Sequence, residues 1–392
     1  MIQGNRAILF LTSWYPVQSN PSHGIFVRNH ALALSLFQNV IVAYAYSCDK
    51  GPFYKVEHKN VNQNFTEYII RYPKSSSLLR SWQSFSKYRK AHRLLIDHIA
   101  QKHIDMIAVQ LNVVFPAAIV LPMYKKIFLG KHTIVEHWSG YLANDGNYKG
   151  FLLKYFTKKC FSSAAKIWYV SEVQKEAMKK HGLNGEFELL YNAVNTKTFA
   201  LKRNEPARIK LLHVSSLVEK EKNISGTCRV FKKLQEQNSD FDIVIAGGNG
   251  AELSRAKKIA EQLKLNNILF TGELPPEKIA ELMQTSSALV LFSNYEGMPV
   301  VTLEALSCGL PVFASGVGQL PYMIKKEFGV LTDPGNEDQM INALKKLFSG
   351  DYEFNPQAMH DFVQQHASYE AVGKQMSDFY EEVKAKTSNT KG

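Results

Sequence analysis

The sequence predicts an α/β protein with two doubly wound, Rossmann-like parallel-sheet domains that face each other across a central cleft. Short apolar runs alternate with amphipathic segments along the chain, which is the pattern of a parallel sheet with crossover helices. The alternation restarts after a polar, proline-containing stretch at residues 202–208, which is typical of a linker. A length of 392 residues also suits two domains.

The first half of the chain contains the following expected elements. Strands are predicted at 7–11, 39–44, 104–109, 131–136 and 166–170, with helices at 26–36 and 172–181. The apolar stretch 107–124 includes Gln110, Asn112 and two prolines, so it indicates a buried strand followed by a helix and not a membrane span.

The same rhythm continues in the second half. Strands are predicted at 211–215, 241–246, 267–271, 288–292 and 311–314, with helices at 226–234, 276–283, 300–307 and 369–383. We therefore expect an N-terminal domain at 1–200 and a C-terminal domain at 201–367. Residues 368–392 are expected to form a last helix, returning to the first domain, and a frayed tail.

Composition indicates a folded protein of a reducing compartment. Hydrophobic residues make up 45% and charged residues 21% of the chain, as in ordinary globular proteins. The four cysteines are far apart, which argues against a metal cluster or a disulfide framework. The N-terminal apolar run, residues 7–11, is too short for a signal peptide. A cytoplasmic location is expected, with peripheral association at the inner face of the cytoplasmic membrane as an option.

The charge of +12 is unevenly distributed. Residues 1–200 hold 25 Lys and Arg against 11 Asp and Glu, whereas residues 201–392 hold 22 against 24. A basic half suits a nucleic acid or an anionic membrane surface as partner. An uneven solvated surface without a partner explains the same counts, so the three interpretations stay open at this point.

The segment 293–312 places two carboxylates in a mostly apolar or small-residue context. Together with the apolar run 288–292 before it, the segment is predicted to run strand, loop, helix and strand, with Glu296 in the loop and Glu304 inside the helix. A helix N-terminus suits a phosphate, and a glutamate beside it can accept hydrogen bonds from hydroxyls. The alternative is that Glu296 caps the helix and Glu304 faces solvent.

Residues 80–93 predict a basic amphipathic helix. Trp82, Phe85 and Tyr88 recur at helical spacing. Four basic residues surround them: Lys87, Arg89, Lys90 and Arg93. This composition suits an anionic membrane interface, although packing of the aromatic side chains into the core explains it equally well. Further lysines of the basic half are Lys149, Lys154, Lys158 and Lys159.

Six segments in order resemble motifs of the retaining glycosyltransferases of family 4, whose fold, GT-B, has two Rossmann-like domains. The most specific is Glu296-Gly-Met-Pro followed by Glu304-Ala-x-x-x-Gly-x-Pro-Val, which is similar to the family's E-x7-E region. The others are His23-Gly24-Ile-Phe26, Glu136-His137-Trp138, Tyr191-Asn192-Ala-Val194, Ala246-Gly247-Gly248-Asn-Gly250 and Phe270-Thr-Gly272. The resemblance covers nearly the whole chain.

The resemblance implies transfer of a sugar from a nucleotide diphosphate sugar with retention of configuration and without a metal ion. Glu304 would bond the donor ribose and Glu296 the donor sugar, while His137 would orient the sugar near the reacting carbon. Glu296, His137 and Lys222 are the expected catalytic residues. The implied donor-binding residues are Gly24, Ser216, Lys222, Gly247, Glu296, Gly297, Met298, Pro299 and Glu304.

One position departs from the family pattern. The family commonly carries an Arg and a Lys, six residues apart, that neutralise the leaving diphosphate. Lys222 matches the second, but Ser216 stands in place of the Arg. Loss of one preorganised cation should cost on the order of 2–4 kcal/mol unless another group replaces it. Lys220 and Arg28 are the candidates for that replacement.

The predicted function is transfer of a hexose-type sugar from a UDP- or GDP-sugar to a glycan or lipid-linked acceptor in cell-surface polysaccharide biosynthesis. The acceptor and the membrane are expected on the N-terminal side, at Arg28, Trp82, Lys87, Arg89, Lys90 and Arg93. No cofactor, metal or nucleic acid is expected, and Asp240-Phe-Asp242 is interpreted as a solvated turn because it precedes a strand. The alternatives are a nucleotide-sugar epimerase of the same fold and a non-catalytic nucleic-acid or membrane-binding protein.

Overall fold

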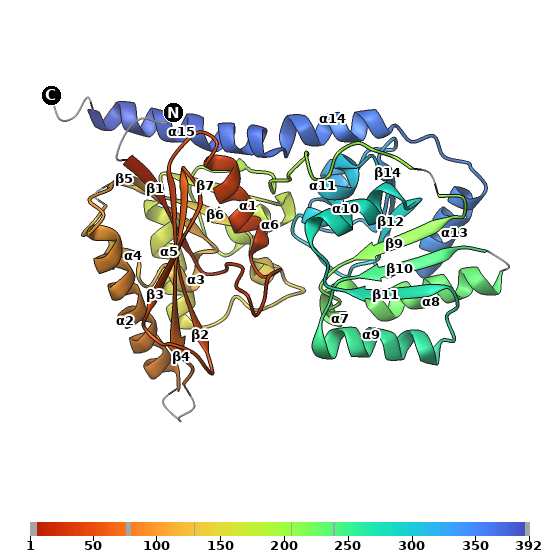
Figure 1. The fold of residues 1–392 in the computed structure, drawn as a ribbon, viewed down its shortest axis with the longest axis horizontal. Helices are drawn as coiled ribbons and strands as arrows, with labels where there is room; N and C mark the ends of the chain where they lie inside the picture. The colour runs from red at the N-terminus through yellow and green to blue at the C-terminus, as the bar shows by residue number, and fades with distance from the viewer. Residues whose placement is uncertain (1–5, 76–79, 129, 205, 238–239, 389–392) are drawn as a thin grey trace. The chain divides into compact units, whose positions relative to one another are not determined.

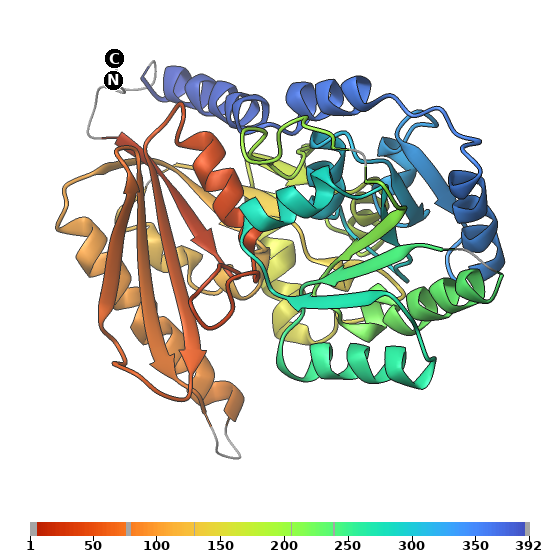
Figure 2. The same ribbon diagram turned by 45° about the vertical axis from the view of Figure 1, so that its right-hand side comes forward.

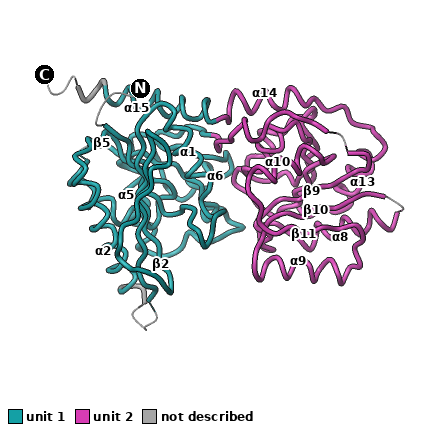
Figure 3. Tube along the Cα trace, viewed as in Figure 1, with its two compact units in different colours: residues 1–190, 369–392 teal, residues 191–368 magenta. Residues whose placement is uncertain are grey.

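The chain forms two compact units, which the computed structural model describes over residues 6–75, 80–128, 130–204, 206–237 and 240–388. Unit 1 comprises residues 1–190 and 369–392, and unit 2 comprises residues 191–368. Figure 3 colours unit 1 teal and unit 2 magenta. Each unit has a wholly or mostly parallel sheet covered by helices (Figure 1), which confirms the predicted α/β class.

Unit 1 is built on a sheet of eight strands within the described residues. In spatial order these are β3 (Val56–Asn62), β4 (Phe65–Pro73), β2 (Val40–Cys48), β1 (Arg6–Thr12), β5 (Asp105–Asn112), β6 (His132–Glu136), β7 (Lys166–Tyr169) and β8 (Phe187–Leu189). All neighbours are parallel except β3 and β4. The strand order reverses at β1, which pairs with both β2 and β5.

Helices cover the sheet of unit 1. They are α1 (Ile25–Leu34), α2 (Arg80–Ala100), α3 (Val114–Ala117), α4 (Leu121–Tyr124), α5 (Phe151–Ser163), α6 (Glu172–Lys180) and α15 (Tyr369–Ser388), with a 3-10 turn, η1 (Ser139–Tyr141). Buried side chains of α2, α3 and α5 share one apolar core with β1, β2 and β5. The last helix, α15, packs against α1, and the two ribbons lie side by side in Figures 1 and 2.

The β3–β4 hairpin is the main element of unit 1 that the sequence analysis did not predict. Most side chains of β3 are exposed, so this edge strand lacks the alternation of apolar and polar residues that marks a half-buried strand. Its pairing with β4 is antiparallel, with Val56 opposite Ile70. The conformation of β3 therefore depends on its pairing with the more buried strand β4, and not on its own composition.

Unit 2 is built on a fully parallel sheet of six strands among the described residues. In spatial order they are β11 (Ile268–Gly272), β10 (Asp242–Ala246), β9 (Lys210–Val214), β12 (Ala288–Leu291), β13 (Val312–Ser315) and β14 (Gly329–Thr332). This is the Rossmann order 3-2-1-4-5-6, which reverses between β9 and β12. Ligands of such sheets bind beyond the carboxyl ends of the strands at this reversal.

The helices of unit 2 cover both faces of this sheet. They are α7 (Glu219–Lys222), α8 (Ile224–Glu236), α9 (Gly250–Gln262), α10 (Pro276–Gln284), α11 (Val300–Ser307), α12 (Leu320–Met323), α13 (Glu337–Phe348) and α14 (Pro356–His366). α8 packs against α9 and α13, while α11 packs against α10 and α14. Helix α11 has the bounds that the sequence predicted, residues 300–307.

The boundary between the units lies at residues 190 and 191, ten residues before the expected boundary at 200 and 201. The segment 191–200 is bound to unit 2 by hydrogen bonds. Val194 N donates to Ala367 O (2.8 Å), and Ser307 Oγ donates to Phe199 O (2.5 Å). The polar stretch 202–208 therefore lies inside unit 2, where Arg203 donates to Met283 O and Ser286 O.

Candidate active site

The candidate site of unit 2 lies at the strand reversal, beyond the carboxyl ends of β9 and β12. The turn after β9 leads into α7, which carries Lys222, and the loop after β12 carries Glu296. Asn294 ties the two together, because its N–H donates to Glu221 O (2.8 Å) and its side chain donates to Lys220 O (3.1 Å). Two segments about seventy residues apart in the sequence thus form one site.

Lys222 and Glu296 form an ion pair at the centre of this site. Lys222 Nζ lies 2.7 Å from Glu296 Oε1 and 2.8 Å from Oε2, and Ser293 Oγ donates to Oε1 (2.8 Å). The side chains are only 16% and 7% exposed, so solvent screens the pair weakly. The sequence predicted a role for each residue but not that the two would be paired.

The turn after β9 is held by a buried histidine. His213 contacts Val290 O (2.9 Å) and Ser215 Oγ (2.8 Å), and Ser215 Oγ accepts the N–H of Leu217 (3.1 Å). Burial lowers the pKa of His213 to about 4, so its ring is neutral at pH 7. Ser216 itself is exposed, and Gly247, directly after β10, donates to Gly272 O (2.7 Å).

The loop 294–299 leaves several backbone N–H groups available. Within the described residues, the N–H groups of Gly297, Met298 and Val300 have no hydrogen-bond acceptor. Pro299 is the N-cap of α11, so these groups lie at the helix N-terminus next to the ion pair. Free N–H groups and the helix dipole favour an anion at such a position.

Residues without an assigned role in the sequence analysis fix this loop. Asn192 Nδ2 donates to Met298 O (2.7 Å), and Gln319 N donates to Gly297 O (2.8 Å). Gln319 belongs to the turn Gly316-Val-Gly-Gln between β13 and α12. The two glycines directly after a strand are a sequence signal for such a turn. Gly318 of this turn has φ +61°, and a Cβ there would lie 2.4 Å from Glu296 O and Gly297 O.

We expect Gly318→Ala to destabilise the protein more than Gly335→Ala does. Both glycines have positive φ, +61° and +77°, but a Cβ at Gly335 meets no atom within 4 Å. Left-handed backbone alone costs roughly 1–2 kcal/mol for alanine, so Gly335→Ala measures that cost. Gly318→Ala additionally displaces two backbone carbonyls of the Glu296 loop. Urea unfolding of both variants tests this, and equal losses would show that the turn does not brace the loop.

Glu304 lies on α11 with a carboxyl group that makes no hydrogen bond or ion pair among the described residues. Burial raises the pKa of this carboxyl to about 7. A desolvated carboxylate without a partner is unfavourable, so the group is suited to accept hydrogen bonds from a hydroxyl-rich ligand. The structure therefore argues against Glu304 as a solvated surface residue.

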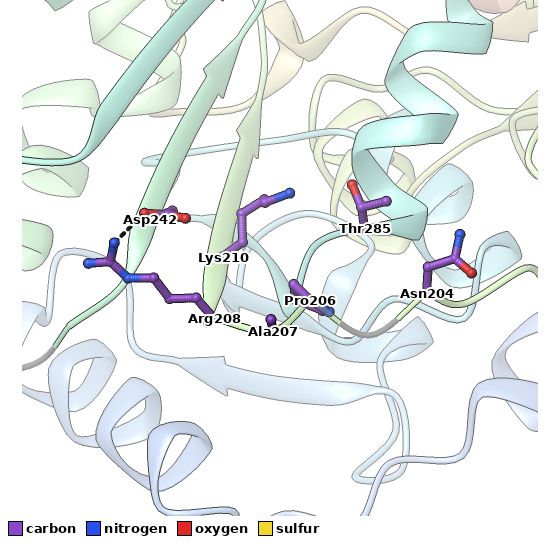
Figure 4. A pocket seen from close by; sticks show the side chains of 7 residues that line it. All are labelled: Asn204, Pro206, Ala207, Arg208, Lys210, Asp242 and Thr285. Atoms are coloured by element: carbon purple, nitrogen blue, oxygen red, sulfur yellow. Dashed lines mark ion pairs between the residues drawn. The ribbon is translucent and has the colours of Figure 1, made fainter.

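A separate hollow of unit 2 lies at the opposite end of the sheet (Figure 4). It is lined by residues at the start of β9 and β10, by the preceding segment and by Thr285: Asn204, Pro206, Ala207, Arg208, Lys210, Asp242 and Thr285. Arg208 pairs with both Asp240 and Asp242, so one guanidinium partly compensates the charge of the two D-x-D carboxylates. Among the described residues, no group of three or more His, Cys, Asp or Glu side chains is arranged to hold a metal ion.

In unit 1, His137 lies directly after β6 among aromatic side chains. Its ring stacks on Phe26 at a centroid distance of 4.2 Å and lies 5.3 Å from the ring of His30. Neither ring nitrogen has a hydrogen-bond partner among the described residues, although the residue is only 8% exposed. Burial, with a smaller effect from His30, lowers the pKa of His137 well below its ordinary value. A neutral imidazole suits orientation of a ligand and not proton donation.

Glu136, the residue before His137, is a fully buried anchor for the loop that follows β6. Its carboxylate accepts the N–H groups of His137 (3.0 Å), Trp138 (3.0 Å) and Val114 (3.2 Å) and the hydroxyl of Tyr141 (3.0 Å). Burial raises the pKa of Glu136, and these donors oppose that rise. Glu136 thereby fixes the position of His137, a role that the sequence analysis did not assign.

Gly24 and Arg28 lie at the start of α1. Gly24 is the N-cap with φ +70°, and a Cβ there would lie 2.6–2.8 Å from backbone atoms of Trp14 and Tyr15, so this close approach requires glycine. Arg28 Nε donates to Glu67 Oε1 (2.9 Å), which also accepts the hydroxyl of Tyr15 (2.6 Å). Arg28 is therefore engaged within unit 1.

Helix α2 confirms the amphipathic helix predicted over residues 80–93, but its described aromatic side chains face inward. Tyr88 is buried and contacts His92, whereas Phe85 is half-buried under Arg89. Lys87 donates to Lys74 O, and Lys90 lies 4.4 Å from the ring centroid of Tyr54. The side chain of Trp82 lies outside the described part of the chain, and Arg93 is exposed. Core packing thus accounts for the buried ring of Tyr88.

Comparison with known proteins connects this site to a family. The family model "Glycosyl transferases group 1" matches residues 196–366, which include both halves of the Lys222–Glu296 site. The chain is 26% identical over 54% of its length to a phosphatidylinositol N-acetylglucosaminyltransferase protein of Arabidopsis thaliana. It is 27% identical over 45% of its length to D-inositol 3-phosphate glycosyltransferase of Corynebacterium jeikeium. The chain spans about half of these two relatives, 48% and 45%.

Solved structures show the same fold. Sucrose-phosphate synthase of Thermosynechococcus elongatus is similar with a TM-score of 0.76 at 18% identity, covering 97% of this chain and 99% of that one. Anabaena HepE, solved with UDP and glucose, is similar with a TM-score of 0.68 at 14% identity, covering 95% and 98%. These neighbours define the architecture as GT-B.

Residues 196–366 are thus similar to the group 1 glycosyltransferases, and the chain shares the fold of the solved GT-B structures. No helix of the described residues is both long and apolar enough to cross a membrane.

Proposed function

We propose that the protein transfers a hexose-type sugar, with retention of configuration, from a UDP- or GDP-sugar to a glycan or lipid-linked acceptor in cell-surface polysaccharide biosynthesis. The observation that carries this proposal is the Lys222–Glu296 pair beside unpaired N–H groups at the strand reversal of unit 2. Cations and N–H groups there suit a diphosphate, and carboxylates suit the hydroxyls of a ribose and a sugar.

The diphosphate would lie against Lys222 and the N-terminus of α11. Lys222 Nζ, now bound to Glu296, would contribute its positive charge to the leaving phosphate as the bond to the sugar breaks. Lys220 of α7 would supply the charge that Ser216 lacks. Its Nζ lies 5.9 Å from the ring centroid of Tyr295, the residue before Glu296. With these donors the proposed reaction would not need a metal ion.

Two carboxylates would hold the rest of the donor. Glu304 would accept the ribose hydroxyls, and Glu296 would accept hydroxyls of the sugar while remaining hydrogen-bonded to Ser293. His137, held by Glu136, would orient the donor sugar with a neutral ring. In a same-face displacement the leaving phosphate oxygen takes the acceptor proton, so no side chain is needed as base.

The names of the relatives support this choice of substrates. The two curated relatives compared above are named for sugar transfer to inositol-containing acceptors, and HepE was solved with UDP and glucose. For this chain we infer a nucleotide diphosphate sugar as donor and a hydroxyl of a glycan or a lipid-linked glycan as acceptor.

Release of nucleoside diphosphate tests the proposal. The purified chain is incubated with UDP- and GDP-hexoses, in EDTA, with and without a membrane lipid and glycan extract. We expect release with one donor that depends on the extract, and a product with the anomeric configuration of the donor. Free sugar released at the same rate without the extract would indicate an epimerase or hydrolase instead.

A further inference from the structure

Helix α5 of unit 1 carries large apolar side chains on its exposed face as well as on its buried face. Thr157, Cys160 and Phe161 are buried toward the sheet. Phe151, Leu152 and Tyr155, in the first turns of the helix, are 80%, 61% and 49% exposed. The outward face is therefore apolar at its N-terminal end, where a solvated helix would be polar.

These three side chains form a cluster and are not scattered. They are three of the eight large hydrophobic residues that are exposed in the described part of the chain. The rings of Phe151 and Tyr155 are stacked, with centroids 6.1 Å apart. Single exposed apolar residues are normal on a protein surface, but a contiguous group indicates an interaction site.

Lysines surround this cluster on the same stretch of chain. Lys149, Lys154, Lys158 and Lys159 are exposed and make no ion pair with a carboxylate among the described residues. On the next helix, α6, Lys175 and Lys179 pair with Glu172 and Glu176. The positive charge of α5 is thus left uncompensated locally. We call Phe151, Leu152, Tyr155 and these four lysines the α5 face.

We propose that the α5 face docks on a membrane surface with anionic headgroups. The aromatic and leucine side chains would enter the boundary between headgroups and acyl chains, and the lysines would contact the phosphates. Charge alone would suit a nucleic acid or an acidic protein as well. The exposed apolar cluster at the end of the lysine-rich stretch favours a lipid surface, which is complementary to both components.

This assignment moves the expected membrane contact from α2 to α5. On α2 the ring of Tyr88 is buried and that of Phe85 is half-buried, so its described aromatic side chains offer little apolar surface. On α5 the apolar and basic groups face outward together. Membrane docking agrees with the lipid-linked acceptor of the proposed function, but it does not depend on the donor site of unit 2.

Binding of the full chain to vesicles, without nucleotide sugar, tests the proposal separately from catalysis. Vesicles of phosphatidylcholine alone and with 30% phosphatidylglycerol are sedimented with the wild type, Lys158→Glu/Lys159→Glu and Phe151→Ser/Tyr155→Ser. The matched control is Lys257→Glu/Lys258→Glu on α9 of unit 2, another adjacent pair of exposed lysines. Melting temperatures confirm that each variant is folded.

We expect the wild type and the α9 control to bind the anionic vesicles but not pure phosphatidylcholine. The charge-reversed α5 variant should lose about tenfold or more in affinity, and the Phe151→Ser/Tyr155→Ser variant should lose the binding that resists 0.5 M salt. Equal losses in the α5 and α9 lysine variants would overturn the proposal. So would absence of vesicle binding together with salt-sensitive binding of a polynucleotide or an acidic protein.

Discussion

Replacement of Lys222 by methionine should lower kcat by at least about 100-fold, the usual size of losing one preorganised electrostatic contact to a transition state. Among the described residues, Lys222 is the cation that pairs with Glu296, at 2.7 Å. It lies beside the free N–H groups at the N-terminus of α11. The leaving diphosphate of the proposed reaction would lose its nearest positive charge. Single-turnover kinetics with saturating donor measures the effect, and an unchanged rate would remove Lys222 from the reaction.

A structural role of Lys222 is separated from a catalytic one by a double variant. Lys222→Met alone leaves the Glu296 carboxylate, 7% exposed, without its cation, which should cost roughly 3–5 kcal/mol of stability. Lys222→Met/Glu296→Gln removes both charges, so stability should largely return. Turnover should remain low in the double variant. Recovery of turnover together with stability would mean that the pair only holds the loop.

Glu304→Gln should change the pH dependence of stability in a defined direction. Burial raises the pKa of Glu304 from 4.5 to about 7 in the folded protein. Below about pH 4.5 the carboxyl is protonated in both states and contributes nothing. Between 4.5 and 7 the unfolded state releases its proton first, so stability falls as pH rises, and above 7 the full penalty remains.

Glutamine lacks this ionisation penalty. The variant should match the wild type near pH 4.5 and exceed it at pH 8 by at most about 3.5 kcal/mol, at about 1.4 kcal/mol per pKa unit. Nucleotide affinity should move in the opposite direction, rising with pH through 7 only in the wild type, because the ionised carboxylate accepts ribose hydroxyls more strongly. Urea unfolding and calorimetric titration from pH 5 to 8 measure both. If stability and nucleotide affinity changed with pH in the same way in both proteins, Glu304 would not be the titrating group of the donor site.

The sequence predicted those helices and strands that are marked by residues within or next to the element itself. Helix α11 lies at residues 300–307 because Pro299 precedes it and Gly309 follows it, and both signals are visible in the chain. The buried parallel strands were predicted from apolar runs such as residues 288–292. Strand β3 was not, since an exposed edge strand depends on its neighbour β4 for its conformation.

The candidate site was predicted as separate residues and not as an arrangement. Resemblance to a family singled out Lys222, Glu296 and Glu304, but the ion pair of the first two depends on the neighbouring positions of β9 and β12 in the sheet. The roles of Glu136, Asn192 and Gly318 depend on hydrogen bonds and close approaches between distant segments. No spacing along the chain reveals contacts of that kind.

Thermal melting with nucleoside diphosphates is the sharpest test of a nucleotide-sugar site at Glu304. The wild type and Glu304→Ala are melted with saturating UDP, GDP, ADP or dTDP in the presence of EDTA. A ligand at 100 times its Kd adds about 2.7 kcal/mol of stability, enough to raise the melting temperature measurably. We expect UDP or GDP to stabilise the wild type without metal, and Glu304→Ala to abolish the shift. No shift with any nucleotide, or an equal shift in both proteins, would contradict a donor site at Glu304.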